Sequence, residues 1–236
     1  MENNMFSFVD ACQSIGITVT PEQFALFEQY YELLIEWNQK MNLTAITGIE
    51  DVFKKHFYDS LTIAFDYPFD HQTIVDVGAW AGFPSIPLKI IYPNLKVTIV
   101  DSLGKRITFL NHLIEELGLK DVQAIHARAE EFAKDHREMY DLATARAVAR
   151  LNVLDELCLP LVKVGGDFLV LKGKAGQEEY KEAKKGITIL GGELTDSRHF
   201  TLDYDEDHRY NLIIHKVKKT PAKYPRAFGA IKKKPL

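Results

Sequence analysis

The sequence predicts an α/β fold: a mostly parallel sheet of seven strands with an antiparallel hairpin at one edge and a helical cap at the N-terminus. From residue 73 onward, short apolar runs alternate with amphipathic segments, which is typical of a parallel sheet with helices on both faces. The preceding residues instead have the three-to-four-residue periodicity of helices. Two late apolar runs, 193–200 and 209–217, are joined by the polar turn "DYDEDHR", which favours an antiparallel pair.

Residues 1–66 are the predicted helical cap. In "TPEQFALFEQYYELLIEWNQK", Thr20 can cap a helix, Pro21 suits its first position and Gln23 completes a capping box. Aromatic and aliphatic residues then recur every three or four positions and form one apolar stripe. A second helix is expected in "IEDVFKKHFYDSLTIAF", with His56 on its partly apolar side.

Residues 67–219 are the predicted sheet domain, and residues 220–236 are a predicted basic tail. The chain has a formal net charge of -4, but after Asp207 it contains nine lysines and arginines and no acidic residue. Such an asymmetry favours contact with a polyanion, although lysine-rich ends are often only solvated. The expected strands of the domain are 73–77, 96–101, 122–126, 140–145 and 166–172, and the expected helices are 83–91, 105–117, 148–159 and 178–190.

Several classes of protein are disfavoured by what the sequence lacks. No apolar stretch approaches the ~20 residues of a membrane span, and "MENNMFSFVD" has none of the features of a secretory signal. The two cysteines, Cys12 and Cys158, offer neither a disulfide framework nor metal-ligand spacing. We therefore expect a cytoplasmic monomer with no membrane contact and no metal.

The first predicted strand runs into "TIVDVGAWAGFPSIPL", which suits a tight turn beneath a ligand. In open α/β sheets, ligands bind beyond the carboxyl ends of the strands, and Gly78 allows the backbone to approach one closely. Asp101, which ends the second strand, can accept hydrogen bonds from ribose hydroxyls. The dinucleotide fingerprint G-x-G-x-x-G is not matched, because Trp80 and Phe83 stand at its second and third glycines. The turn thus favours S-adenosylmethionine (AdoMet), with a dinucleotide as the weaker alternative.

These residues belong to longer blocks that resemble one known family along nearly the whole chain. The blocks are "EWNQKMNLTAIT", "KHFYDSL", "VDVGAWAGFPSIPLKI", "VTIVDSLGKRITFLNHL", "ARAEEF", "DLATARAVARL", "ELCLPLVKVGG" and "KYPR". They resemble the bacterial small-subunit ribosomal RNA methyltransferases that modify guanine N7 in 16S RNA, historically called glucose-inhibited division protein B. The resemblance implies a Rossmann-like AdoMet-dependent methyltransferase fold, AdoMet as methyl donor, and 16S ribosomal RNA or the small ribosomal subunit as partner.

Carried over by position, the resemblance implies cofactor contacts at Gly78, Phe83, Ala129, Glu130 and Arg146. Asp101 joins them on the ribose argument above. From the residues alone, Phe83 is equally a core residue and Glu130 equally an exposed carboxylate at a helix start. Arg146 ends a buried strand and can pair with the methionine carboxylate, the RNA backbone or the guanine, so we expect it to position the reactants.

The candidate RNA contacts are Lys105, Arg106, Arg150 and His56, although each also has an ordinary surface or structural interpretation. Guanine N7 carries a free lone pair and no proton, so its methylation needs alignment and charge stabilisation but no general base. The sequence agrees, because "ATARAVAR" follows the fourth strand where enzymes acting on exocyclic amines carry Asn/Asp-Pro-Pro-aromatic.

Two departures from the family pattern affect these expectations. Trp80 replaces the middle glycine of the turn, which costs on the order of 1–2 kcal/mol if φ is positive there, and its indole could intrude on the methionine end of the site. We expect a weakened but present AdoMet site; the alternative is an RNA- or ribosome-binding protein with the same fold and impaired AdoMet binding. In addition, "YPRAFGAIKKKPL" lacks the Lys-Pro-Gly that follows this point in the family.

Overall fold

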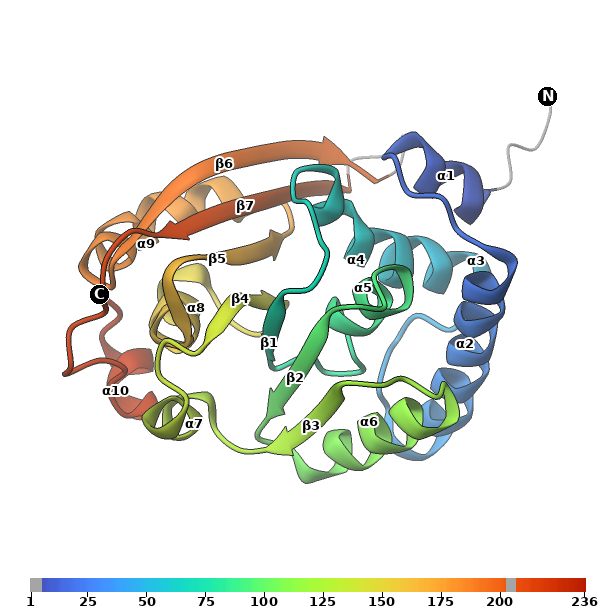
Figure 1. Ribbon diagram of the computed structural model, residues 1–236, viewed down its shortest axis with the longest axis horizontal. Coiled ribbons are helices and arrows are strands. Elements are labelled where there is room, and N and C mark those ends of the chain that lie inside the picture. The colour runs from blue at the N-terminus through green and yellow to red at the C-terminus, as the bar shows by residue number, and fades with distance from the viewer. Residues whose placement is uncertain (1–5, 203–206) are drawn as a thin grey trace.

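The computed structural model describes residues 6–202 and 207–236 and has three layers, a central sheet between two layers of helices (Figure 1). The seven strands run in the order β3-β2-β1-β4-β5-β7-β6. Strands β1 to β5 are parallel, and β7 pairs antiparallel with both β5 and β6. The predicted α/β class and edge hairpin are confirmed, while residues 203–206 of the hairpin turn lie outside the described residues. The strands are β1 (Thr73–Val77), β2 (Lys96–Asp101), β3 (Val122–His126), β4 (Tyr140–Arg146), β5 (Val162–Lys172), β6 (Gly192–Thr201) and β7 (His208–Lys216).

Helices cover both faces of the sheet because the central strands are apolar on both sides. Ile74 of β1 and Ile99 of β2 pack into one core, whereas their neighbours Val75 and Val100 pack into the other. The N-terminal helices, α5 and α6 lie on the first face and α7 to α10 on the second, right and left of the sheet in Figure 1. The helices that follow β1 are α5 (Ser85–Ile91), α6 (Gly104–Glu116), α7 (Ala129–Asp135), α8 (Leu151–Cys158), α9 (Gly176–Ile189) and α10 (Phe228–Lys233).

The N-terminal cap consists of α1 (Phe8–Ser14), α2 (Pro21–Met41) and an irregular helix over residues 49–65. Helix α2 begins with the predicted capping box: the Thr20 hydroxyl accepts from the Gln23 amide at 3.2 Å, and the Gln23 side chain accepts from the Thr20 amide at 3.0 Å. The second predicted helix is divided into α3 (Ile49–Val52), a π-helical segment (Phe53–Tyr58), α4 (Asp59–Leu61) and a 3₁₀ turn (Thr62–Phe65). π-Helical segments occur frequently at functional sites, and this one contains His56.

The cap shares its hydrophobic core with the sheet. Phe27 and Tyr30 of α2 are fully buried in the same cluster as Ile74 of β1. The Tyr30 hydroxyl also donates a hydrogen bond of 2.5 Å to the carbonyl of Ala81, in the turn after β1. The predicted cap, residues 1–66, is a separate helical region in the sequence, but in the structure its helix α2 supports the turn that follows β1.

The C-terminal residues are basic as predicted, but they pack on the second face of the sheet. The Arg226 guanidinium forms a salt bridge of 2.7 Å with Glu156 of α8, and Ile231 of α10 is fully buried. Arg137 donates hydrogen bonds to the carbonyls of Thr220 and Tyr224 at 2.6 and 2.5 Å. These contacts anchor the segment before and within α10.

Helix α7 and the start of strand β5 are two of the places where the structure differs from the predicted boundaries. Helix α7 was not among the expected helices, because its seven residues are too few to show a clear period. Strand β5 begins at Val162 instead of residue 166, because Gly165 and Gly166 interrupt the apolar run. A side chain at Gly166 would collide with the carbonyl of Asp141, so the glycine allows the close approach of β4. Within residues 6–202 and 207–236, no helix is long and apolar enough to cross a membrane.

Candidate active site

Two pockets adjoin at the carboxyl ends of the parallel strands. The glycine-turn pocket lies over the ends of β1, β2 and β3, and its lining includes Gly78, Asp101 and Glu130. The arginine pocket lies over the ends of β4 and β5, and its lining includes Arg146 and the π-helical segment. Val148, in the loop after β4, lines both pockets. The sheet order reverses between β1 and β4, so this is the crevice where ligands of open α/β sheets bind.

The turn after β1 requires its two glycines. Gly78 has a φ of +71° and its amide donates to the carbonyl of Val100 at 2.8 Å. A Cβ on Gly78 would lie 2.7 Å from a methyl carbon of Val148, and one on Gly82 would lie 2.6 Å from the Tyr30 hydroxyl. Both positions are therefore closed to any larger residue unless neighbouring groups move.

Trp80 has the positive φ expected for the middle of the turn, +58°. Its indole points toward the arginine pocket, where it packs edge-to-face against His56 and Phe83 with ring centroids 5.8 and 6.4 Å apart. It is not part of the lining of the glycine-turn pocket. The position of the indole thus gives no support to the alternative in which Trp80 blocks the cofactor.

The glycine-turn pocket gathers Gly78, Asp101, Ala129 and Glu130 from three separate strand ends. Asp101 is buried; its Oδ1 accepts from the Leu103 amide at 2.8 Å and its Oδ2 from the Arg106 guanidinium at 3.2 Å. Ala129 and Glu130 open α7 and are also buried. Arg106, a predicted RNA contact, therefore faces the acid of this pocket.

The chemistry of this pocket fits an adenosine-bearing cofactor such as AdoMet. Because Gly78 has no side chain, a ligand can approach its backbone closely, and the Asp101 carboxylate can accept hydrogen bonds from ribose hydroxyls. Two residues before Gly78, the buried Asp76 accepts from the Ser85 amide at 3.1 Å, while its Oδ1 has no partner among the described residues. Burial raises the pKa of Asp76 to about 7. Asp76 is fully buried beneath the turn and lines neither pocket, so it supports the turn from below.

Arg146 is the centre of the arginine pocket. Its Nη1 donates to Asp59 Oδ2 at 3.3 Å and to the Ser60 hydroxyl at 3.2 Å, and its Nη2 donates to His56 Nδ1 at 3.0 Å. The guanidinium also lies 5.0 Å from the ring centroid of Phe83. Arg146 thus lies outside the glycine-turn pocket that holds most of the other predicted cofactor contacts.

His56 is a neutral, buried histidine. Because an arginine only donates, His56 Nδ1 accepts from Arg146, and its Nε2 carries the proton and donates to the Thr44 hydroxyl at 3.0 Å. Burial, followed by the charge of Arg146, lowers the pKa of His56 to about 3. The ring also stacks on Phe83 at 4.7 Å. His56 therefore orients Arg146 and cannot act as a general base while both of its nitrogens are occupied.

The remaining predicted residues occupy different positions. Phe83 is buried, stacks on Tyr30 with centroids 5.6 Å apart and does not line the glycine-turn pocket. Arg150 lies on the rim of the arginine pocket, where its guanidinium pairs with Glu182 at 2.7 Å. Lys105 is exposed at the start of α6 and makes no ion pair with any described residue.

Several charged residues of the arginine pocket were not singled out from the sequence, among them Asp59, Lys172 and Arg209. Asp59 bridges Arg146 and Arg209, whose Nε donates to Asp59 Oδ1 at 3.0 Å. Burial raises the pKa of Asp59 although both guanidinium groups oppose this. Lys172, at the end of β5, pairs with Glu179 at 2.8 Å. The sequence held one signal for Asp59: it lies in the block "KHFYDSL", three residues after His56, a spacing that places both residues on the same side of a helix.

A parallel sheet in this strand order, with a glycine turn after β1 and a buried acid ending β2, defines an AdoMet-dependent methyltransferase of the Rossmann-like class. Solved structures of this class share the fold. Precorrin-6y C5,15-methyltransferase from Geobacter metallireducens superposes with a TM-score of 0.53 at 13% identity, over 67% of this chain and 87% of that one. P. horikoshii TYW2 superposes with a TM-score of 0.54 at 16% identity, over 67% and 61%.

The chain belongs to the rRNA small subunit methyltransferase G family, whose profile matches residues 23–207. A relative from Lysinibacillus sphaericus, named ribosomal RNA small subunit methyltransferase G, is 53% identical over 236 residues and covers 99% of both chains. A relative of the same name from Staphylococcus haemolyticus is 58% identical over 223 residues, 94% of this chain and 93% of its own. The resemblance found in the sequence blocks is confirmed, and with it AdoMet as the cofactor. Among the described residues, no cluster of histidine, cysteine, aspartate and glutamate is placed to hold a metal ion.

Proposed function

We propose that this protein transfers a methyl group from AdoMet to N7 of a guanine in 16S ribosomal RNA, and that it does so in the cytoplasm. The observation that carries the proposal is that the two pockets meet over Gly78, where Val148 lines both. A cofactor in the glycine-turn pocket and a base in the arginine pocket would meet at this boundary. The name shared by the relatives supports ribosomal RNA of the small subunit as the substrate.

The residues of the arginine pocket suit a reaction that needs no proton transfer. When bound, AdoMet would supply an electrophilic methyl group, and its transfer to the lone pair of guanine N7 would leave S-adenosylhomocysteine and a cationic guanine, with no proton to remove. His56 has no free nitrogen to accept a proton, and burial raises the pKa of the fully buried Cys158 thiol well above its ordinary value. What these residues can do is position the base, which is the main requirement of the reaction.

The walls of the arginine pocket are suited to an unstacked purine. The pocket has a volume of about 650 Å³, within the usual range for ligand sites. Trp80 lies along it, and Arg146 presents a planar guanidinium. Aromatic rings and arginine planes are the groups on which single-stranded bases stack. A guanine that leaves its RNA stack could therefore enter between them.

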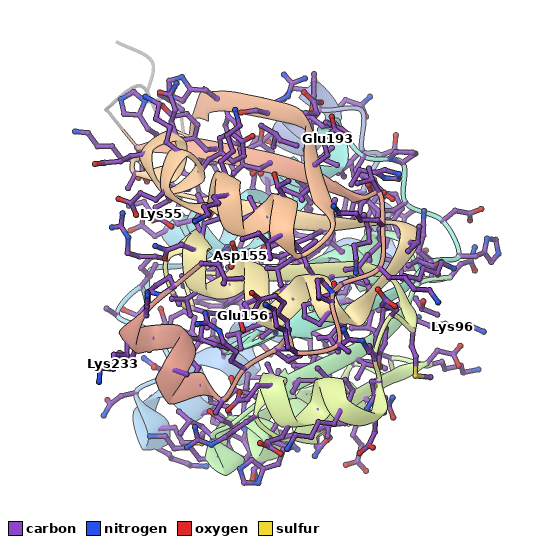
Figure 2. The ribbon with its side chains drawn as sticks, turned by 90° about the vertical axis from the view of Figure 1, so that its left-hand side faces the viewer. Lys55, Lys96, Asp155, Glu156, Glu193 and Lys233 are labelled. Atoms are coloured by element: carbon purple, nitrogen blue, oxygen red, sulfur yellow. The ribbon has the colours of Figure 1, made fainter. Side chains whose placement is uncertain are left out.

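Basic side chains surround this end of the molecule. Figure 2 shows Lys55 and Lys233 at one edge and Lys96, the first residue of β2, at the opposite edge. The first edge is therefore the one where the parallel strands end. The exposed Lys105 lies in the first turn of α6, the helix that follows β2, and Lys55 lines the arginine pocket. Lys55 and Lys105 are placed to contact RNA phosphates around the base, and such contacts weaken as salt rises.

The test is to map the product. Purified protein is incubated with AdoMet and either 16S ribosomal RNA or small subunits, and the RNA is digested for mass spectrometry of 7-methylguanosine. The matched control is Asp101→Ala, which removes the ribose carboxylate at the cofactor pocket and leaves the arginine pocket intact. We expect one 7-methylguanosine with the wild type and a large loss with the variant. Methylation of another atom, or AdoMet binding without transfer to either RNA, would overturn the proposal.

A further inference from the structure

The glycine-turn pocket has one wall that comes from the far end of the chain. Phe228, the first residue of α10, lines the pocket together with Leu157 of α8 and Ala129 of α7. Its ring is half-buried and packs against the second hydrophobic core. Asp101 and Arg106 line the same pocket from β2 and α6. The pocket therefore has an apolar wall and a polar wall.

The position of Phe228 is held by strong contacts on both sides. Two residues earlier, Arg226 binds Glu156 of α8: its backbone amide and Nε donate to Glu156 Oε1 at 2.7 and 2.9 Å, and its Nη2 donates to Oε2 at 2.7 Å. Glu156 is fully buried and lies near the middle of the face seen in Figure 2. Three residues later, Ile231 is fully buried. These two contacts anchor the chain on either side of Phe228, whose side chain lines the pocket.

We infer that the C-terminal segment 220–236 completes the cofactor site, with Phe228 as the apolar wall against the adenosine part of AdoMet. The inference rests on the assignment of this pocket to AdoMet. Adenine has two apolar faces and a polar edge, whereas ribose is rich in hydroxyl groups. The ring of Phe228 matches an adenine face, Asp101 matches the ribose hydroxyls, and the buried Glu130 carboxylate can accept from the exocyclic amine.

In this arrangement, the C-terminal residues that the sequence predicted only as a basic tail have a second role. The lysines of α10 point outward, as Lys233 does at the edge of Figure 2, while Phe228 at the start of the same helix lines the pocket. The two sides of one short helix thus belong to different surfaces. Loss of the aromatic ring should weaken the cofactor, whereas loss of an outward lysine should not.

The experiment is calorimetric titration of the full-length protein with AdoMet and with S-adenosylhomocysteine. Aromatic stacking on a base contributes roughly 1–3 kcal/mol, so Phe228→Ala should weaken both ligands on the order of tenfold. The factor should be the same for both ligands, because they share the adenosine. Phe228→Tyr, which keeps an aromatic face, should retain most of the affinity, and Lys233→Ala is the matched control on the same helix.

The outcomes separate the inference from the assignment of the pocket. If the wild type binds AdoMet and Phe228→Ala binds it within twofold, the inference is wrong and the cofactor assignment stands. The inference is also wrong if Lys233→Ala weakens binding as much as Phe228→Ala. If the wild type binds neither ligand, both are overturned. A thermal melt of each variant shows whether α10 remains docked, and Phe228→Leu provides a second test if the alanine variant unfolds.

Discussion

Replacing Trp80 by glycine tests whether the indole helps the substrate or hinders the cofactor. The variant regains the cost of a positive φ, about 1–2 kcal/mol for a non-glycine residue. It loses two edge-to-face contacts, with His56 and Phe83, worth ~0.5–1.5 kcal/mol each. Glycine also costs roughly 0.5–1 kcal/mol in chain entropy on folding. Together these terms run from about 0.5 kcal/mol of gain to about 3 kcal/mol of loss, and the half-buried indole also loses its packing against the core, so we expect Trp80→Gly to lose about 1–3 kcal/mol in urea unfolding.

The effect on ligands should be unequal. The indole does not line the glycine-turn pocket, so the AdoMet dissociation constant from calorimetry should stay within about twofold of the wild type. Methyl transfer to RNA should fall about tenfold or more, because removal of a stacking surface costs roughly 1–3 kcal/mol per base. Trp80→Phe keeps an aromatic ring and should retain most of the transfer rate. A tenfold gain in AdoMet affinity for Trp80→Gly would refute this reasoning, since it would mean that the indole occupies cofactor space.

Four further substitutions test other parts of the structure. Lys105→Ala should weaken RNA binding and reduce the salt slope of that binding by about one, without changing AdoMet affinity. Arg106→Ala should instead alter AdoMet affinity, because Arg106 pairs with Asp101 in the cofactor pocket. Equal effects of the two substitutions on both ligands would contradict the separate positions of the two side chains. Arg226→Met leaves the fully buried Glu156 without its counter-ion, so the free energy of unfolding in urea should fall by about 3–5 kcal/mol. A loss below 1 kcal/mol would show that the C-terminal segment is not anchored at Glu156. Burial raises the pKa of Asp155 from 3.8 to about 8, so the folded wild type loses stability as pH rises between these values and no further above them. Asp155→Asn lacks this loss, so its advantage over the wild type should grow from pH 5 to pH 8; a difference that is independent of pH would contradict the shift.

The sheet and its turn could be predicted because their signals are local. The first three strands have the predicted limits, since each is a short apolar run between polar residues. Trp80 does have a positive φ, the condition raised from the sequence for this glycine position. The capping box of α2 likewise depends on residues only three positions apart.

The division of the site into two pockets could not be predicted in the same way. Phe83 and Arg146 lie in the same sequence blocks as the glycine turn and the fourth strand, but their side chains point away from the glycine-turn pocket. That direction depends on stacking with Tyr30 and on the Asp59 carboxylate, which come from the cap. The docking of the C-terminal segment is similarly hidden, because its main ion pair joins residues that are 70 positions apart.

The loop after β4 decides how the two pockets communicate. Its ends are fixed: Arg146 is held by Asp59, and Lys172 donates to the Ala149 carbonyl at 2.5 Å. Between them, Ala147 has a φ of +55° and Val148 is exposed, with a methyl carbon directly over Gly78. The glycine-turn pocket is only about 140 Å³ with this side chain in place. Val148 therefore stands at the boundary that a methyl group would cross between the two pockets, next to the anchored Arg146.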